Sequence, residues 1–228
     1  MNKSVAAIAE SINVELANSI RQLESTGEKI TKMQTGDPDF ATPEFICLAA
    51  QAAMNNGDTH YCASNGQLAL RTALKNKLIT KNNLTCVDES NILITHGAVH
   101  GVYVVMQTLI NPQDEVIIIS PYWMPYASNI ELAGAKPVIV ESKMSDGFIP
   151  QIAEIIAATT NKTKAIIINS PNNPTGCVYD QSSLQLIADH CVKHDIYLIS
   201  DEVYEDIIYG SYVGNGDKDN HYQRQHIS

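Results

Sequence analysis

The stretch AIIINSPNNPTG, residues 165–176, decides the fold class of this chain. Four consecutive apolar residues, Ala165 to Ile168, are typical of a strand that is covered on both faces, as strands of parallel sheets are. The polar run that follows is rich in Pro, Asn and Gly, which are turn residues. A buried strand that ends in such a turn indicates an α/β protein with a parallel sheet.

Strands and helices alternate on both sides of this stretch. Short β-branched runs predict the strands, and apolar residues at helical spacing predict the helices between them. The strands are expected at 92–95, 115–120, 137–141, 165–169 and 196–200, and the helices at 43–55, 68–78, 98–110, 124–133, 151–158 and 182–193. This order predicts a doubly wound, mostly parallel sheet. We expect residues 1–45 to form an N-terminal arm with part of a small domain, and residues 46–228 to form a large domain.

Composition narrows the possible partners. The chain has 15 basic and 25 acidic residues and a net charge of −10, which disfavours a nucleic-acid partner. The longest apolar stretch, around residues 101–106, is much shorter than the roughly 20 residues of a membrane helix. Glu10 interrupts a short apolar run near the N-terminus, so no signal peptide is predicted. Five scattered cysteines without a C-x-x-C motif indicate reduced thiols, and we expect a cytoplasmic protein.

Polar and aromatic residues collect directly after the expected strands. In doubly wound sheets, ligands bind beyond the carboxyl ends of the strands. The segments at these ends are Thr95–Ala98, Ser120–Trp123, Asn169–Gly176 and Asp201–Tyr204, and only the segment after residues 137–141 is unremarkable. The sequence therefore predicts a ligand pocket at this edge.

Each of these features also has an ordinary structural interpretation. Thr95–Ala98 is either a plain turn or a phosphate cradle of backbone amides at a helix N-terminus. Trp123, the only tryptophan, is either a core residue or a ring that stacks on a flat ligand. The pair Asn172 and Asn173 either completes a turn or donates to an anionic ligand oxygen. Asp201 is either a helix N-cap or a carboxylate that pairs with a ligand cation.

Other common sites are disfavoured by their missing motifs. His96 and His100 lack the glutamate of an H-E-x-x-H zinc motif, and the group His190, Cys191 and His194 ends a helix, so no metal site is predicted. The chain has no G-x-S-x-G, no G-x-G-x-x-G after its first expected strand and no P-loop motif. These absences disfavour an α/β-hydrolase, a dinucleotide oxidoreductase and a P-loop NTPase.

Taken in order, the segments resemble the class I and II aminotransferases, which are pyridoxal-phosphate enzymes with the aspartate aminotransferase fold. The matching segments are Thr35–Phe40, Thr42–Pro43, His60–Tyr61, Gly66, Leu70–Arg71, Thr95–Ala98, Asn111–Val116, Pro121–Tyr126, Asn172–Gly176 and Asp201–Glu205. One segment alone has little specificity, whereas their common order over residues 35–209 is specific. Gln113 departs from the pattern, since the family usually has glycine there.

The resemblance implies roles for the residues around the cofactor ring. Asp201 would pair with the pyridine nitrogen and keep it protonated. Asn173 and Tyr204 would hydrogen-bond the phenolic oxygen, and Trp123 would stack on the ring.

The resemblance also implies roles at the phosphate and the substrate. The backbone amides of Gly97 and Ala98 would hold the phosphate. Tyr61 would reach the phosphate of the neighbouring subunit, which implies a homodimer. Gly36 and Asn173 would lie near the substrate.

The implied activity moves an amino group from an α-amino acid to a 2-oxo acid, and the sequence does not specify which acids. A pyridoxal-phosphate lyase of the same fold shares these motifs and is the alternative. Family members carry a Schiff-base lysine in a Ser-Lys segment beyond the Asp-Glu-Val-Tyr motif, but the only lysine after Asp201 is Lys218, between Asp217 and Asp219. We therefore expect the N-terminal portion of such an enzyme, with no catalytic residue of its own and no activity by itself. A non-catalytic cofactor binder is the other alternative.

Overall fold

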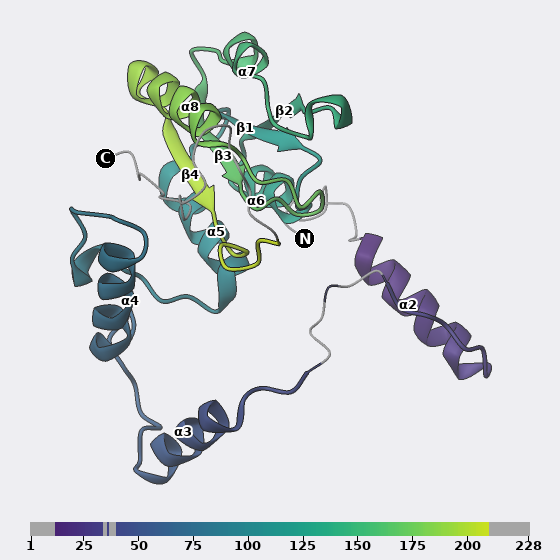
Figure 1. Cartoon of the computed structure of the whole chain (residues 1–228), viewed down its shortest axis with the longest axis vertical. Coiled ribbons are helices and arrows are strands. Elements are labelled where there is room, and N and C mark those ends of the chain that lie inside the picture. The colour runs from purple at the N-terminus through teal and green to yellow at the C-terminus, as the bar shows by residue number, and fades with distance from the viewer. Residues whose placement is uncertain (1–11, 34–35, 37–39, 210–228) are drawn as a thin grey trace. The chain divides into compact units, whose positions relative to one another are not determined.

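The computed structural model describes residues 12–33, 36 and 40–209 (Figure 1). These residues fall into two compact units, one that ends at Ser64 and one that begins at Asn65. The expected domain boundary between residues 45 and 46 stays a prediction.

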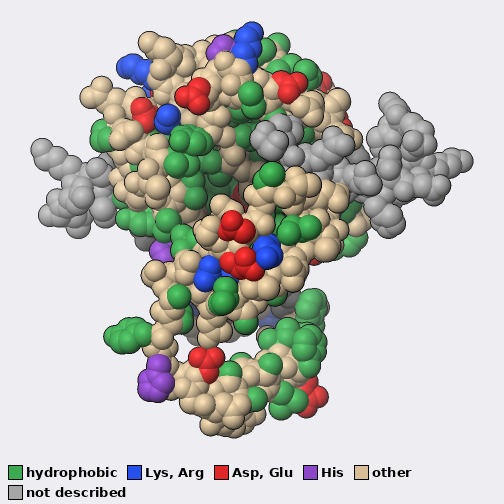
Figure 2. Space-filling model, turned by 90° about the vertical axis from the view of Figure 1, so that its left-hand side faces the viewer, with side chains coloured by type: hydrophobic (Ala, Val, Ile, Leu, Met, Phe, Trp, Pro, Cys, Tyr) green, Lys and Arg blue, Asp and Glu red, His purple; other side chains and the backbone are tan. Residues whose placement is uncertain are grey.

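The first unit contains two helices, α2 (Ile12–Ser25) and α3 (Glu44–Asn55). Helix α3 begins directly after Pro43, whose ring suits the start of a helix, and its chain turns at Gly57. No residue of α3 is buried, and Phe45, Leu48 and Met54 are largely exposed. Exposed apolar side chains of this kind are visible in several separate patches on the face drawn in Figure 2.

The second unit is built on a parallel sheet of four strands. They are β1 (Glu115–Ser120), β2 (Lys136–Glu141), β3 (Thr163–Asn169) and β4 (Tyr197–Asp201), in the order β2-β1-β3-β4. In the register, Ile118 of β1 lies opposite Ile139 of β2 and Ile167 of β3. The predicted parallel, doubly wound sheet is thus confirmed.

Helices cover both faces of this sheet (Figure 1). Helices α7 (Ile152–Ala158) and α8 (Gln181–His194) pack on one face, against residues such as Ile117 and Ile166. Helices α5 (Gly97–Leu109) and α6 (Pro125–Leu132) pack on the other face, against residues such as Ile118 and Ile167. Successive side chains of a strand point to opposite faces, so burial on both sides requires consecutive apolar residues. This is why the two central strands read VIII and AIII.

The prediction of a strand at residues 92–95 is wrong. These residues follow a short 3-10 helix (Glu89–Asn91) in an extended conformation, but they join no strand within the described ranges. The backbone amide of Ile94 donates instead to the carbonyl oxygen of Asn65, at 3.1 Å. A β-branched run favours extended backbone, but a strand also needs a neighbouring strand in register, which the local pattern cannot supply.

Gly66 allows the chain to pass close to this extended segment. Its φ is +99°, and a Cβ built there would lie 2.3 Å from Cγ1 of Ile94. A side chain at this position would therefore be strained and would also collide with Ile94. The carbonyl oxygen of Gly66 accepts a hydrogen bond from Nε of Arg71, at 3.1 Å, which ties this turn to helix α4 (Leu68–Thr80).

The residues after β4 are held against α4 and the turn that follows it. Lys77 pairs with Glu205, and Lys81 pairs with Asp206. The buried Asn82 donates through Nδ2 to Oε2 of Glu205, at 2.8 Å. These contacts join the segment beyond β4 to an element far away in the sequence.

Among the described helices, none combines the length and the apolar character needed to cross a bilayer.

Candidate active site

The strand order places a topological switch point between β1 and β3. After β1 the chain passes to α6 on one face of the sheet, and after the adjacent β3 it passes to α8 on the other face. Where neighbouring strands diverge in this way, a ligand-binding crevice opens at their carboxyl ends. The loop after β1 carries Trp123, and the loop after β3 carries Asn173. Both predicted site residues therefore lie at this switch point.

Asp201 is the last residue of β4 and lies opposite Asn169, the last residue of β3. Its Oδ2 accepts a hydrogen bond from the phenol of Tyr126, at 2.5 Å, and its Oδ1 accepts one from the backbone amide of Val203, at 3.1 Å. No helix follows Asp201 in the described residues up to 209, so it does not act as a helix N-cap there. Its carboxylate is instead held by one donor on each oxygen.

Tyr126 is almost fully buried, with 2% of its surface exposed. Burial raises the pKa of its phenol, and the hydrogen bond and negative charge of Asp201 raise this pKa further. Tyr126 therefore stays protonated at physiological pH and acts as a hydrogen-bond donor. The nearby Tyr204 phenol contributes a smaller increase, which places Tyr204 within electrostatic reach of this group.

Trp123 packs its ring edge-on against Tyr126. The two ring centroids are 5.3 Å apart, and the ring planes form an angle of 78°. Trp123 is only partly buried against the core cluster of α5 and α6. It is thus both a packing residue and a partly exposed aromatic ring at the carboxyl edge of the sheet.

The loop after β3 is organised by two asparagine side chains. Asn169 is buried, and its Nδ2 donates to the carbonyl oxygens of Pro171, at 3.1 Å, and Asp201, at 3.0 Å. Its Oδ1 accepts from the backbone amide of Asn173, at 2.7 Å. Asn172 closes the turn by accepting from the backbone amide of Thr175, at 3.1 Å. Asn172 therefore has a turn role, while Asn173 is placed by its own backbone beside Asn169.

The N-terminus of α5 lies at the same edge of the sheet. A short loop joins the end of α5 to the start of β1, and Met106 and Ile110 pack on the sheet, so α5 runs antiparallel to β1 and its first turn lies toward the carboxyl ends of the strands. Gly97 has a φ of +77°, and no atom lies within 4 Å of a Cβ built there. Its amide donates to the carbonyl oxygen of Thr95, at 2.9 Å. The amides that lack acceptors in a first helical turn begin here with Ala98.

Two predicted site residues lie in the other unit. Gly36 and Tyr61 are both exposed there. Their assigned roles toward substrate and phosphate stay predictions.

Sequence reasoning assigned no role to two residues of this site, Tyr126 and Asn169, although both lie in segments that it singled out. Tyr126 follows Trp123 by three positions at the start of a helix, a spacing that brings two side chains to the same side. Asn169 is the last residue of its strand, as Asp201 is of β4. The three-residue spacing could have pointed to Tyr126, and the strand-end position could have pointed to Asn169. Neither signal reveals the hydrogen bonds that these side chains make to Asp201 and Asn173.

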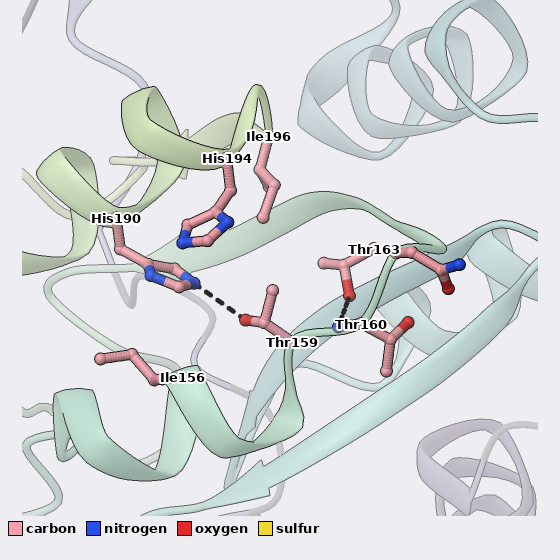
Figure 3. A pocket seen from close by; sticks show the side chains of 8 residues that line it. Ile156, Thr159, Thr160, Thr163, His190, His194 and Ile196 are labelled. Atoms are coloured by element: carbon pink, nitrogen blue, oxygen red, sulfur yellow. Dashed lines mark hydrogen bonds between the residues drawn. The ribbon is translucent and has the colours of Figure 1, made fainter.

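A separate pocket of about 390 Å³ lies at the opposite edge of the sheet, where β3 and β4 begin (Figure 3). Thr159 donates to the carbonyl oxygen of Ile155, at 2.8 Å, so its hydroxyl oxygen accepts from Nε2 of His190, at 2.9 Å. Thr160 donates to Glu115, at 2.5 Å. The lining residues are Ile156, Thr159, Thr160, Asn161, Thr163, His190, His194 and Ile196, and none of them is a predicted site residue.

The free energy of unfolding should fall as the pH is lowered through about 6.5, partly because of His190. Burial, followed by the positive charges of His194 and Lys193, lowers the pKa of His190. The unfolded chain then binds more protons than the folded chain in this range, so acidification favours unfolding. Urea unfolding at several pH values should show a smaller loss of stability for His190→Gln than for the parent. His60→Gln, at an exposed position, should lose as much stability as the parent. Equal losses for the parent and His190→Gln would contradict the assignment.

Comparisons with known proteins show the family of this chain. Residues 28–224 match the family described as aminotransferase class I and II. The aspartate aminotransferase of Bacillus subtilis (strain 168) is 38% identical over 91% of this chain and 53% of its own length. The aspartate/prephenate aminotransferase of Thermus thermophilus is 37% identical over 92% of this chain and 54% of its own length. The chain thus spans about half the length of the curated relatives that it matches.

Solved structures resemble the fold closely. A structure of aspartate aminotransferase from Thermus thermophilus with maleate has a TM-score of 0.89 at 37% identity, over 92% of this chain and 55% of that one. Alanine aminotransferase from Pyrococcus furiosus has a TM-score of 0.88 at 29% identity, over 92% of this chain and 54% of that one. Because the family match covers most of the sequence and the strand-end site lies within it, the chain belongs to the class I and II aminotransferases.

Proposed function

We propose that the full-length protein carrying these residues is a pyridoxal-phosphate-dependent aminotransferase that moves an amino group from an α-amino acid to a 2-oxo acid. The observation that carries this proposal is the Asp201 carboxylate, which is held by two donors at the carboxyl edge of the sheet in a member of this family. Aspartate is the first amino donor to assay, because the two curated relatives cited above are named aspartate and aspartate/prephenate aminotransferases.

The residues at the carboxyl edge fit the chemical groups of pyridoxal phosphate. A carboxylate such as Asp201 suits a protonated ring nitrogen, and the partly exposed indole of Trp123 suits a flat ring. The first turn of α5 suits a phosphate, because its amides and helix dipole favour an anion. Gly97 leaves open the space that a side chain would fill, so a phosphate can approach the backbone there.

Each residue would contribute a separate physical effect. When bound, the cofactor supplies an electron-withdrawing ring that stabilises negative charge at the substrate α-carbon. Asp201 would favour the protonated ring nitrogen by charge pairing, and Trp123 would shield the ring from water. Asn173 and Tyr204 would donate to the phenolic oxygen, and the first turn of α5 would hold the phosphate, with the open backbone at Gly97 allowing its approach and the amide of Ala98 donating to it.

The proton transfer at the α-carbon is not assigned to this chain. The resemblance places the Schiff-base lysine beyond the Asp-Glu-Val-Tyr segment, and Lys218 has none of the expected neighbours. The residues described here would therefore bind and orient the cofactor and the substrate. The proton shuttle is assigned to the part of the enzyme that relatives carry beyond this segment.

The remaining assignments follow from the same proposal. The complete enzyme would be a cytoplasmic homodimer of amino-acid biosynthesis, in which Tyr61 reaches the phosphate site of the neighbouring subunit. Gly36 and Asn173 would lie near the substrate. The small domain would begin within residues 1–45, and residues 46–228 would belong to the cofactor-binding domain.

Borohydride reduction of the full-length protein tests the cofactor directly. The protein is incubated with pyridoxal phosphate, reduced, and measured by intact mass spectrometry. We expect one added pyridoxyl group per chain, together with amino-group transfer from aspartate to a 2-oxo acid. A missing adduct would contradict the proposal. An adduct with release of a β- or γ-substituent instead of amino-group transfer would favour a lyase of the same fold.

A further inference from the structure

Tyr126 connects the two groups that are assigned to the cofactor ring, the Asp201 carboxylate at the ring nitrogen and the Trp123 indole that stacks on the ring. Its phenol donates to Oδ2 of Asp201, and its ring packs edge-on against Trp123. Its backbone amide also donates to the carbonyl oxygen of Trp123, at 3.0 Å. One residue thus contacts both the carboxylate and the indole, although β4 and the loop after β1 are far apart in the sequence.

The carboxylate of Asp201 has few ways to turn. Its Oδ1 is held by the amide of Val203, and its backbone carbonyl oxygen accepts from Nδ2 of Asn169, at 3.0 Å. The Tyr126 phenol holds the second oxygen and so determines the rotation of the carboxylate plane. Each carboxylate oxygen can accept more than one hydrogen bond, so this contact leaves Oδ2 able to accept from a ligand as well.

Tyr126 is itself rigidly placed. It lies in the core cluster of α5, α6 and the sheet, next to Met106, Val116 and Ile130, all of which are fully buried. A buried aromatic side chain in a packed cluster has few accessible rotamers. Its hydroxyl therefore reaches Asp201 from a fixed point, and its raised pKa keeps the donor proton in place.

We propose that Tyr126 is a positioning residue that aims the Asp201 carboxylate at the ring nitrogen of pyridoxal phosphate. This inference rests on the proposed function. Tyr126 does not contact the reacting atoms in this assignment; it acts through Asp201. A merely structural tyrosine would support the pocket as a whole and would affect every ligand of the pocket equally.

Two ligands separate these roles. Pyridoxal phosphate and its 1-deaza analogue share the aldehyde, phenol and phosphate, and differ only in the ring nitrogen. The experiment measures the Kd of both ligands, by absorption, for the full-length protein and for Tyr126→Phe. This substitution removes only the hydroxyl and keeps the ring that packs on Trp123.

The parent should bind pyridoxal phosphate more tightly than the analogue. Tyr126→Phe should raise the Kd for pyridoxal phosphate about 10-fold, because a hydrogen bond to a charged group is lost, and should change the Kd for the analogue less than about 2-fold. Equal increases for both ligands, or no change for either, would overturn the inference. A parent that binds neither ligand would contradict the proposed function itself.

Two further variants control for folding and for loss of a hydroxyl. Tyr197→Phe removes a hydroxyl at the other end of β4, where the ring lies against Lys164, and should leave both Kd values unchanged. Tyr126→His keeps an aromatic N–H donor and should restore part of the preference for the ring nitrogen. If Tyr126→Phe does not fold, a histidine variant with no preference for the ring nitrogen would overturn the inference.

Discussion

Replacing Asp201 by asparagine is expected to lower kcat/KM of the full-length protein by about 10²–10³-fold. Asparagine has the same shape, and its oxygen can still accept from the Tyr126 phenol, so the fold should survive. The negative charge is lost, however, and the protonated ring nitrogen of the cofactor then has no paired carboxylate. Steady-state kinetics with aspartate and a 2-oxo acid measure the loss.

Asp206→Asn is the matched control for Asp201→Asn. Asp206 lies five residues later, is largely exposed, and pairs with the exposed Lys81, which directly follows α4. Exposed ion pairs contribute little to folding stability, so the variant should stay folded and its kcat/KM should stay within about twofold of the parent. An Asp201→Asn enzyme with parent-like kcat/KM would show that this carboxylate does not serve the cofactor.

Replacing Ile166 by alanine is expected to lower the free energy of unfolding by about 2–5 kcal/mol. Ile166 has no exposed surface, and it lies on the central strand β3 in the core cluster under α7 and α8. Removing its side chain leaves a cavity between packed layers that can relax only in part. Chemical unfolding followed by circular dichroism measures the change.

Ile139→Ala makes the same chemical change in the same sheet at an exposed place. Ile139 lies on the edge strand β2 and is 51% exposed. Ile139→Ala should lower the free energy of unfolding by less than about 1 kcal/mol, because the removed atoms bury little apolar surface. Similar losses for the two variants would mean that the layer beneath α7 and α8 does not carry the stability of this unit.

Local sequence patterns predicted most of the elements in the second unit. Strands β1 and β3 and their flanking helices follow from short apolar runs and helical spacing, which act through neighbouring residues. The prediction fails at residues 92–95, which have the β-branched composition of a strand but bond to the backbone at Asn65 through Ile94. Whether an extended segment becomes a strand depends on a partner that can lie anywhere in the chain.

The strand-end positions of Trp123, Asn173 and Asp201 could be predicted from local sequence, because residues that follow a buried strand lie at an edge of the sheet. The adjacency of β1 and β3, and the hydrogen bond from the Tyr126 phenol to the Asp201 carboxylate, are known from the folded structure alone. Strand order and side-chain contacts of this kind arise from packing between segments that are distant in sequence. A local pattern constrains the backbone of one segment, but it does not specify which other segment will pack beside it.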